Sequence, residues 1–258
     1  MANNFPFNLE SRQTHDARIT PKADGGWRLE IPAGTGGRYR LAQLDDYSNL
    51  KRSRFRWAEG INFELRARVA HPCIPGTWGF GLWNDPFAMG ALAGLKGIRL
   101  PKLPQAAWFF YAAHPGYLSL RDDLAAQGWL ASTFRSPTWS SFKLALGLPF
   151  LPLLLIPGAS RKIRASASSI IRQDARSLSV NPTEWQHYRM EWNTGQTIFF
   201  VNDEAVLETR ISPAGPLGIV IWIDNQYAAW SPDGKLRYGM CENRNPAWLE
   251  IKDLKISS

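Results

Sequence analysis

The chain has 258 residues, a length at which β-sandwiches and β-barrels still form one domain, so we expect a single domain over residues 1–258. Its composition is that of an ordinary globular protein except for twelve Trp, which need either a core or a role in stacking against flat ligand faces. The formal net charge of +8 favours anionic partners such as nucleic acid, a phospholipid surface or an acidic substrate.

The cysteines and the N-terminus exclude several classes of protein. Cys73 and Cys241 lie far apart and have no CxxC or Cys/His ligand spacing, which argues against zinc binding and thioredoxin-like chemistry and favours free thiols. Residues 1–20 contain no basic region followed by an apolar one, so we expect no signal peptide. The expected location is cytoplasmic, with the peripheral membrane contact discussed below.

Antiparallel strands are predicted from residue 24 onwards. Residues 24–69 contain short alternating runs, among them WRLEI and NFELRARV, separated by glycine-rich or polar turns. In the next run, TWGFGLWND, a period of two places on one face Gly79, Gly81, Trp83 and Asp85. Glycine in such a strand indicates either the close approach of a ligand or backbone, or a bulge or tight packing of the sheet.

Central strands and hairpins follow. The segment QAAWFFYAA, residues 105–113, is apolar throughout, which predicts a central strand buried on both faces. The segments WQHYRMEW, TIFFVN and AVLETRI predict consecutive hairpins. LGIVIWID predicts another central strand, residues 225–239 a loop, and WLEIKDLKI the last strand.

An insertion at about 140–178 interrupts this pattern. Residues 144–159 are uncharged, but they contain three prolines and are too short for a membrane-spanning helix. The following residues, 159–176, predict an amphipathic helix. One arc would carry Ala159, Ile163, Ala167, Ile170 and Ile171. The opposite arc would carry Arg161, Lys162, Arg164, Arg172 and Arg176.

Two interpretations of this insertion remain open. An apolar loop beside a basic amphipathic helix is typical of an interfacial membrane contact or of a lid over a hydrophobic ligand. The residues predicted for this role are Leu148, Phe150, Leu151, Leu154, Arg161, Lys162 and Arg164. Alternatively, the helix packs on the sandwich with its basic face in water, and the loop fills a crevice.

The runs FELRARV, PGTWGFGLWND, EWQHYRMEW, FFVNDEAVLET and LGIVIWID carry a resemblance that covers roughly residues 60–256. In their order and pattern they resemble the concanavalin A-like jelly rolls, and within these the family 16 glycoside hydrolases and the laminin-G-like modules. The resemblance implies an all-β jelly-roll sandwich of two antiparallel sheets, with the helical and hydrophobic insertion at about 140–178.

The catalytic residues of family 16 have no counterpart in this sequence. Those enzymes carry two glutamates with an aspartate between them on one central strand, because retaining hydrolysis needs paired carboxylates. By chain order the matching strand is residues 105–113, which contain no carboxylate, and no E-x-D-x-E pattern occurs elsewhere. GxSxG, HExxH, Walker and strand-to-helix GxGxxG signatures are also missing.

Two strand ends instead suggest a ligand site. Trp83-Asn84-Asp85 and Trp222-Ile223-Asp224 each set an indole and a carboxylate on one face. If these strand ends are neighbours, two aspartates face a hollow walled by Trp, the usual composition of a ligand pocket. We predict as ligand-binding residues Trp78, Trp83, Asn84, Trp108, Phe110, Tyr111, Trp222, Asn225, Gln226, Tyr227 and Trp230.

Asp85 and Asp224 are the candidate catalytic residues. Desolvation against indole would raise the pKa of one, which could then act as a general acid while the other stayed ionised. The alternative is structural, because NDP and DNQ are both sequences in which an aspartate accepts backbone hydrogen bonds at a turn.

Two functions follow from these residues. The first is binding of a hydrophobic small molecule in an aromatic cleft, with acid-promoted isomerisation or cyclisation, at or near an anionic membrane surface. The alternative is a carbohydrate-binding protein or a divergent family 16-like glycoside hydrolase, because Trp faces suit pyranose stacking.

No nucleic-acid partner is expected, because the basic residues are not interleaved with an RNA-binding aromatic motif. No cofactor or metal is expected, and calcium is a side hypothesis that the resemblance implies without a DxDxDG run to support it.

Overall fold

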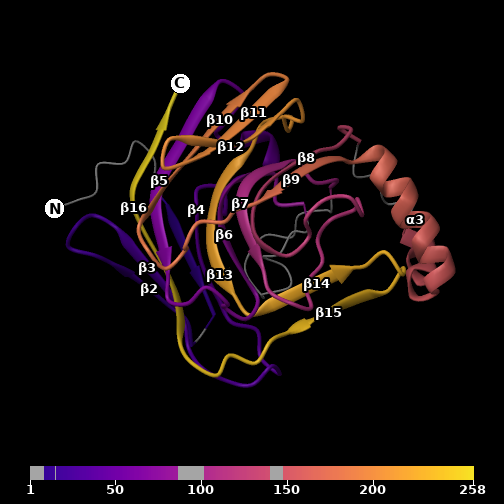
Figure 1. Cartoon of the computed structure of the whole chain (residues 1–258), viewed down its shortest axis with the longest axis horizontal. Coiled ribbons are helices and arrows are strands. Elements are labelled where there is room, and N and C mark those ends of the chain that lie inside the picture. Colours follow the sequence, from indigo (N-terminus) through magenta and orange to yellow (C-terminus); the bar gives the residue numbers. More distant parts are fainter. Residues whose placement is uncertain (1–8, 15, 87–101, 140–147) are drawn as a thin grey trace.

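The computed structural model describes residues 9–14, 16–86, 102–139 and 148–258, with side chains in the segment 148–151 left out. Two seven-stranded sheets, paired antiparallel throughout, face each other (Figure 1). Sheet 1 has the order β1 (Glu10–Gln13), β4 (Leu41–Asp45), β13 (Gly218–Asp224), β6 (Thr77–Trp83), β7 (Ala106–Ala112), β8 (Gly128–Arg135) and β9 (Arg172–Ser177). Sheet 2 has the order β12 (Glu204–Thr209), β11 (Gln196–Val201), β10 (Gln186–Asn193), β5 (Ile61–Val69), β16 (Ala247–Ser257), β3 (Trp27–Ile31) and β2 (Arg18–Pro21).

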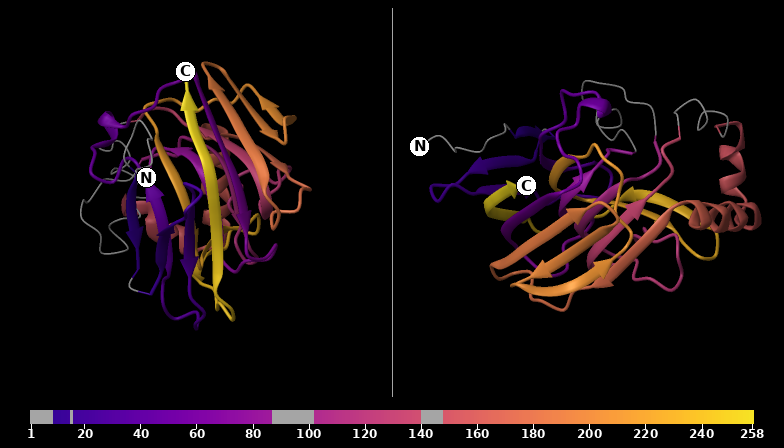
Figure 2. Two further views of the ribbon diagram at one scale, coloured as in Figure 1. Left: turned by 90° about the vertical axis from the view of Figure 1, so that its left-hand side faces the viewer. Right: turned by 90° about the horizontal axis from the view of Figure 1, so that it is seen from above.

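Three further pieces complete the described fold. β14 (Gln226–Trp230) and β15 (Leu236–Met240) form a separate two-stranded ribbon. The helical elements are η1 (Arg52–Arg54), η2 (Leu148–Leu155) and α3 (Pro157–Ile170). Seen from above, η2 and α3 stand at one end of the sandwich, and the ribbon extends toward them (Figure 2). None of the described helices is long and apolar enough to cross a membrane.

The predicted alternation of the strands builds the core between the sheets. In β5 the side chains of Phe63 and Leu65 are fully buried, whereas Glu64 between them is half-buried and Arg66 beyond them is exposed. Aromatic rings from the two sheets meet in this core. Phe109 of sheet 1 lies 5.3 Å from Phe199 of sheet 2, in an edge-to-face arrangement. The predicted all-β sandwich of two antiparallel sheets is therefore confirmed, and the central position of β7 and β13 with it.

The insertion is shorter than predicted. The helix ends at Ile170, and Arg172 and Arg176 belong to β9, which pairs with β8 from Arg172 opposite Arg135 onwards. The backbone of β8 offers a row of hydrogen-bonding groups to this segment, and that pairing outweighs its helical periodicity. The segment 225–239 also differs from the predicted loop, because most of it forms the β14–β15 ribbon.

Candidate functional site

A cleft of about 310 Å³ lies on the face of sheet 1 that points away from sheet 2. Its floor comes from the central strands β13, β6 and β7, whose alternate side chains leave the core face and point outward. The lining residues are Tyr39, Leu41, Gln43, Thr77, Trp83, Trp108, Phe110, Leu118, Trp222, Asp224, Gln226, Ala228 and Tyr238.

Glycine residues in β6 make room for the aromatic floor. Gly79 stands between Trp222 of β13 and Phe110 of β7 in the strand register. A Cβ atom at Gly79 would lie 2.9 Å from the Trp222 ring and 2.4 Å from the Phe109 carbonyl oxygen. At Gly81 it would lie 2.7 Å from the Trp108 Cβ. Of the two interpretations of these glycines, tight packing of the sheet fits the structure.

The aromatic rings of the floor form one continuous surface. Trp83 and Trp222 are almost parallel, with an interplanar angle of 6° and ring centroids 6.4 Å apart. Trp108 and Phe110 complete the array, with centroids 5.6 and 5.7 Å from that of Trp222. Such an array offers flat apolar faces to a ligand and keeps its own geometry through mutual packing.

Asp224 supplies the charge-bearing group of the cleft. Its carboxylate accepts hydrogen bonds from the Thr77 hydroxyl at 2.8 Å and from the backbone N–H groups of Thr77 and Gln226 at 3.2 Å. The Tyr39 hydroxyl donates to it more weakly at 3.4 Å. Burial outweighs these donors and raises the pKa of Asp224 to about 7, so that at neutral pH the group exists in both protonation states.

Two buried polar atoms of lining residues have no hydrogen-bond partner. They are Nε1 of Trp108, a donor, and Oε1 of Gln226, an acceptor. The other floor indoles differ, because Trp222 Nε1 donates to the Thr77 hydroxyl at 2.9 Å and Trp83 Nε1 to the Tyr47 hydroxyl at 2.7 Å. A buried polar group without a partner costs about 1–3 kcal/mol, so the described residues leave the hydrogen bonding of this donor and this acceptor incomplete.

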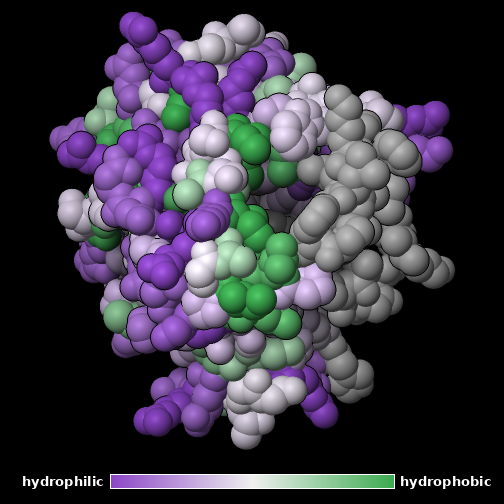
Figure 3. All heavy atoms as spheres, turned by 90° about the vertical axis from the view of Figure 1, so that its right-hand side faces the viewer, coloured by the Kyte–Doolittle hydropathy of each residue, from purple (hydrophilic) through white to green (hydrophobic). Residues whose placement is uncertain are grey.

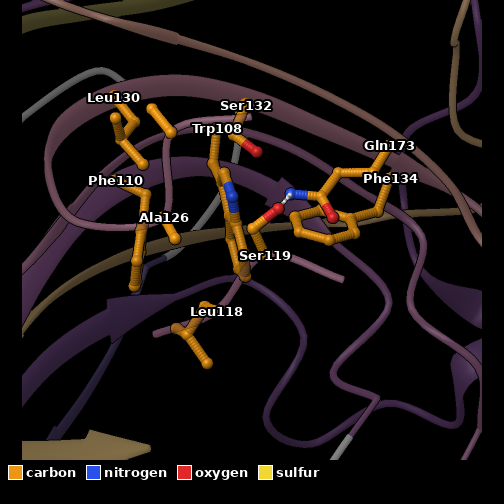
Figure 4. Close-up of a pocket in the computed structure, with 10 residues that line it drawn as sticks. Trp108, Phe110, Leu118, Ser119, Ala126, Leu130, Ser132, Phe134 and Gln173 are labelled. Carbon is orange, nitrogen blue, oxygen red and sulfur yellow. Dashed lines mark hydrogen bonds between the residues drawn. The ribbon is translucent and has the colours of Figure 1, made fainter. Parts of the chain in front are cut away.

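A smaller cavity of about 20 Å³ adjoins the cleft and shares three of its walls, Trp108, Phe110 and Leu118. Figure 4 shows the Trp108 indole standing between Phe110 on one side and Ser119 and Gln173 on the other. Gln173 donates to the Ser119 hydroxyl at 3.1 Å. The cavity has room for about one water molecule, so it extends the cleft only slightly.

The expectation that Asp85 and Asp224 share a hollow is wrong. β6 and β13 are antiparallel, and the register pairs Trp83 with Gly218 and Thr77 with Asp224. Trp83 and Asp224 therefore lie at opposite ends of the paired strands, about 20 Å apart at the usual rise per residue, and Asp85 follows two residues beyond Trp83. Asp85 is buried in the turn after β6, with φ at +48°, and its carbonyl accepts a hydrogen bond from the Arg52 guanidinium.

The structure divides the other predicted ligand-binding residues. Five lie together in the cleft: Trp83, Trp108, Phe110, Trp222 and Gln226. Trp78 and Tyr111 instead point into the core, where their rings stack at 5.6 Å, because they are one residue out of phase with the cleft-facing set. The ligand-binding role of the five remains a prediction.

Polar side chains at the strand ends hold loops rather than line the cleft. Asn84 donates to the Leu103 carbonyl and accepts from the Gln105 N–H. Asn225 accepts from the Arg40 N–H and donates to the Cys241 carbonyl. On the ribbon, Tyr227 and Trp230 are half-buried outside the cleft lining, and the Trp230 indole donates to the Ser160 hydroxyl at 2.9 Å.

Some lining residues escaped sequence analysis although a signal was present. Leu41 and Gln43 alternate with the core residues Ala42 and Leu44 in β4, so period two assigns them to the outer face. Thr77 precedes Gly79 by two residues in the same phase. Tyr39, Leu118, Ala228 and Tyr238 had no such signal, because only the tertiary fold brings their segments to the cleft.

The insertion contributes a structural arginine. Arg161 and Lys162 are exposed and Leu154 is half-buried, while the side chains of residues 148, 150 and 151 lie outside the described residues. Arg164, which was expected on the solvated arc, is buried. Its guanidinium donates to the carbonyls of Trp230 and Ser119 at 2.9 and 3.0 Å and pairs with Asp122 at 2.7 Å.

The thiols are free, as predicted, with Cys73 exposed and Cys241 half-buried. Within the described parts of the chain, no group of three or more His, Cys, Asp or Glu side chains could hold a metal ion.

No family model matches the chain, and a search of the curated proteins found no match either. Among solved structures, the chain is similar to a glycoside hydrolase family protein from Mycobacterium thermorestibile, with 13% identity, a TM-score of 0.47, and coverage of 93% of this chain and 79% of that one. It is also similar to LamAcat from Zobellia galactanivorans, with 14% identity, a TM-score of 0.46, and 92% and 78% coverage. A third is the carbohydrate-binding module CBM66 from Bacillus subtilis, with 7% identity, a TM-score of 0.40, and 98% and 96% coverage.

The arrangement of the two sheets is established by the strand order above and does not rest on these similarities. Likeness at this distance assigns no activity to the chain, and function has to be argued from the cleft itself.

Proposed function

We propose that the protein binds a carbohydrate in the cleft on the outer face of sheet 1. The observation that carries this proposal is the unpartnered donor and acceptor, Trp108 Nε1 and Gln226 Oε1, beside the flat rings of the floor. A pyranose has an apolar C–H face that stacks on an indole, and its hydroxyls both accept and donate. A sugar that covers the Trp222 ring would lie among the residues that carry both orphaned atoms.

The size of the cleft supports a short glycan segment. Its volume of about 310 Å³ lies at the lower end of the ~300–1,000 Å³ range of ligand pockets. Gln43 and Tyr39 add polar groups at the side of the floor formed by β4 and the segment before it. The arrangement of aromatic faces below and amides at the side is suited to hold a sugar by its face and its edge.

Binding is proposed rather than hydrolysis, because glycoside hydrolysis needs two carboxylates flanking the scissile bond, about 5–9.5 Å apart. Among the described residues that line the cleft, Asp224 is the only carboxylate. One oxygen of Asp224 also accepts hydrogen bonds from Thr77 and Gln226, which suits the holding of the cleft wall.

The second candidate is a hydrophobic small molecule, which the mainly apolar lining favours. Nine of the lining side chains are aromatic or aliphatic: Tyr39, Leu41, Trp83, Trp108, Phe110, Leu118, Trp222, Ala228 and Tyr238. An apolar ligand would gain from covering them but would leave Trp108 Nε1 and Gln226 Oε1 without partners. A glycan would therefore bind better with the Gln226 acceptor present, and an apolar molecule would bind better without it.

A glycan array identifies the ligand, and tryptophan fluorescence titration with the best oligosaccharide measures affinity. Trp222→Ala should weaken binding about tenfold or more, because it removes the central stacking face. The matched control is Trp248→Ala on sheet 2, where the indole packs under Arg28 at 4.5 Å and lies outside the cleft. This control should bind as the wild type does.

Gln226→Met separates the two candidates, because it removes the acceptor and keeps the side-chain length. Weaker glycan binding by this variant is the expected result. Absence of any glycan binding by the wild type, together with a co-purified apolar molecule in native mass spectrometry that Gln226→Met holds more tightly, would overturn the proposal in favour of the second candidate.

A further inference from the structure

Several large apolar side chains at the α3 end of the molecule are exposed. Leu155 and Ile156, at the junction of η2 and α3, are 80% and 55% exposed, and Leu153 is 39% exposed. Leu236 and Tyr238 of β15 are 48% and 55% exposed. Burying such side chains in an apolar medium is favourable, and a gathering of them on one face marks an interaction surface.

The two groups of exposed residues lie on elements that pack against each other. The turn between β14 and β15 packs on the start of α3 so closely that a Cβ atom at Gly234 would lie 2.3 Å from the Pro157 carbonyl oxygen. Leu236 follows that turn by two residues, and Ile156 precedes Pro157. Figure 3 views the side of the molecule that carries α3 and shows an apolar strip there, with hydrophilic side chains along one side of it.

Cations outnumber acids around this strip, where Asp122 is paired with Arg164. α3 contains three cationic residues and no acidic one, and two of the three, Arg161 and Lys162, are exposed. Lys235 and Arg237 are exposed on the ribbon. The acid nearest to them in sequence, Asp233, is already paired with Lys235 at 3.3 Å. An apolar strip with a cationic border is complementary to the interface of a bilayer that contains anionic lipids.

We propose that this face, formed by Leu153, Leu155, Ile156, Leu236, Arg161 and Lys162, docks on the surface of an anionic lipid bilayer. The apolar side chains enter the level between headgroups and acyl chains, and the cations meet the lipid phosphates. This surface differs from the sequence-based one, because Arg164 faces inward and the ribbon contributes Leu236.

The docking face is held rigidly against the cleft. Arg164 ties α3 to the ribbon through the Trp230 carbonyl and to the segment after β7 through the Ser119 carbonyl. Tyr238 belongs to both regions, because it lines the cleft and is exposed beside Leu236. Docking therefore brings the rim of the cleft to the level of the lipid headgroups without any rearrangement of the sandwich.

Co-sedimentation with vesicles tests this proposal. The wild-type protein should sediment with vesicles of phosphatidylcholine and phosphatidylserine, and much less with phosphatidylcholine alone or at high salt. The double variant Leu155→Ser/Ile156→Ser and the double variant Arg161→Glu/Lys162→Glu should each lose about tenfold in partitioning. Thermal unfolding curves verify that both variants are folded.

The matched control for charge is Arg18→Glu/Arg66→Glu on sheet 2, which should partition almost as the wild type does. Equal losses in this control, or wild-type partitioning that ignores phosphatidylserine, would overturn the proposal. A wild-type dimer in light scattering that Leu155→Ser/Ile156→Ser converts to a monomer, without vesicle binding, would assign the face to a second copy of the chain instead. Trp222→Ala should bind vesicles normally, which keeps this test independent of the carbohydrate proposal.

Discussion

Asp224 combines the two roles that its sequence context left as alternatives. It lines the cleft, and it also accepts backbone hydrogen bonds at a turn, from Thr77 and Gln226. Hydrogen bonds to a carboxylate lower its pKa and burial raises it, and here burial prevails, with the pKa raised from 3.8 to about 7. A single residue can therefore serve the architecture of the cleft and still exchange a proton near neutral pH.

This pKa makes a prediction for stability. The folded state binds the proton of Asp224 more tightly than the unfolded state does, so the stabilisation is full below about pH 3.8 and is lost as the pH rises to about 7. Asp224→Asn keeps the shape and an acceptor oxygen but does not titrate. Between about pH 4 and 7, the free energy of unfolding of the wild type should fall relative to the variant, by up to about 1.4 kcal/mol per pH unit. Urea denaturation at a series of pH values measures this difference, and a difference that does not change with pH would contradict it.

At the scale of elements, the strand β6 is built around its glycines. Gly79 and Gly81 leave the outer face of the strand bare between Thr77 and Trp83, and the indoles of the neighbouring strands occupy the space. The aromatic floor is therefore a property of three strands together, since Trp222 and Trp108 meet only across β6. This packing explains how large rings from neighbouring strands fit side by side on a sheet whose strands are about 4.8 Å apart.

Gly79→Ala should damage both the sheet and the cleft. The added Cβ would meet the Phe109 carbonyl and the Trp222 ring, so we expect a loss of about 1–3 kcal/mol in the free energy of unfolding and weaker ligand binding. The matched control is Gly37→Ala, because nothing lies within 4 Å of a Cβ at Gly37. It should change stability by less than about 0.5 kcal/mol. Chemical denaturation measures both variants, and equal effects would show that the close packing at Gly79 is unimportant.

At the scale of the whole molecule, the two sheets share one hydrophobic core. Phe109 of β7 contacts the rings of Tyr188 and Phe199 across the interface, at 5.0 and 5.3 Å. Because each sheet buries one face against the other, neither would keep its face covered if the other unfolded. We therefore predict that residues 1–258 form a single domain that unfolds cooperatively.

Phe109→Ala tests that cooperativity. It should lower the free energy of unfolding by about 3–5 kcal/mol, because it opens a cavity between the layers. Far-UV circular dichroism and tryptophan fluorescence should both report one transition, and both midpoints should shift equally. Phe110→Ala is the control, since it points into the existing cleft and should cost less. Two separate transitions, of which only one moves, would mean that the chain contains two independent folding units.

Much of this architecture could be predicted from local pattern. Period-two alternation identified the inward residues of β5, and continuous apolar runs identified the central strands β7 and β13. Of the aromatic residues predicted to bind a ligand, Trp83, Trp108 and Trp222 do line the cleft, whereas Trp78 and Tyr111, in the opposite phase, point into the core. These features are predictable because a strand's faces depend only on the parity of neighbouring positions.

Other features depended on which segments meet. The antiparallel register separates Asp85 from Asp224, the pairing with β8 draws Arg172 and Arg176 out of the helix, and contacts with Ser119 and Trp230 bury Arg164. Parity tells which face a side chain takes, but it contains no information on the neighbour of a strand or its direction. The sequence by itself therefore determined the sandwich and its aromatic outer face, whereas long-range pairing alone decided that one aspartate, and not two, opens into the cleft.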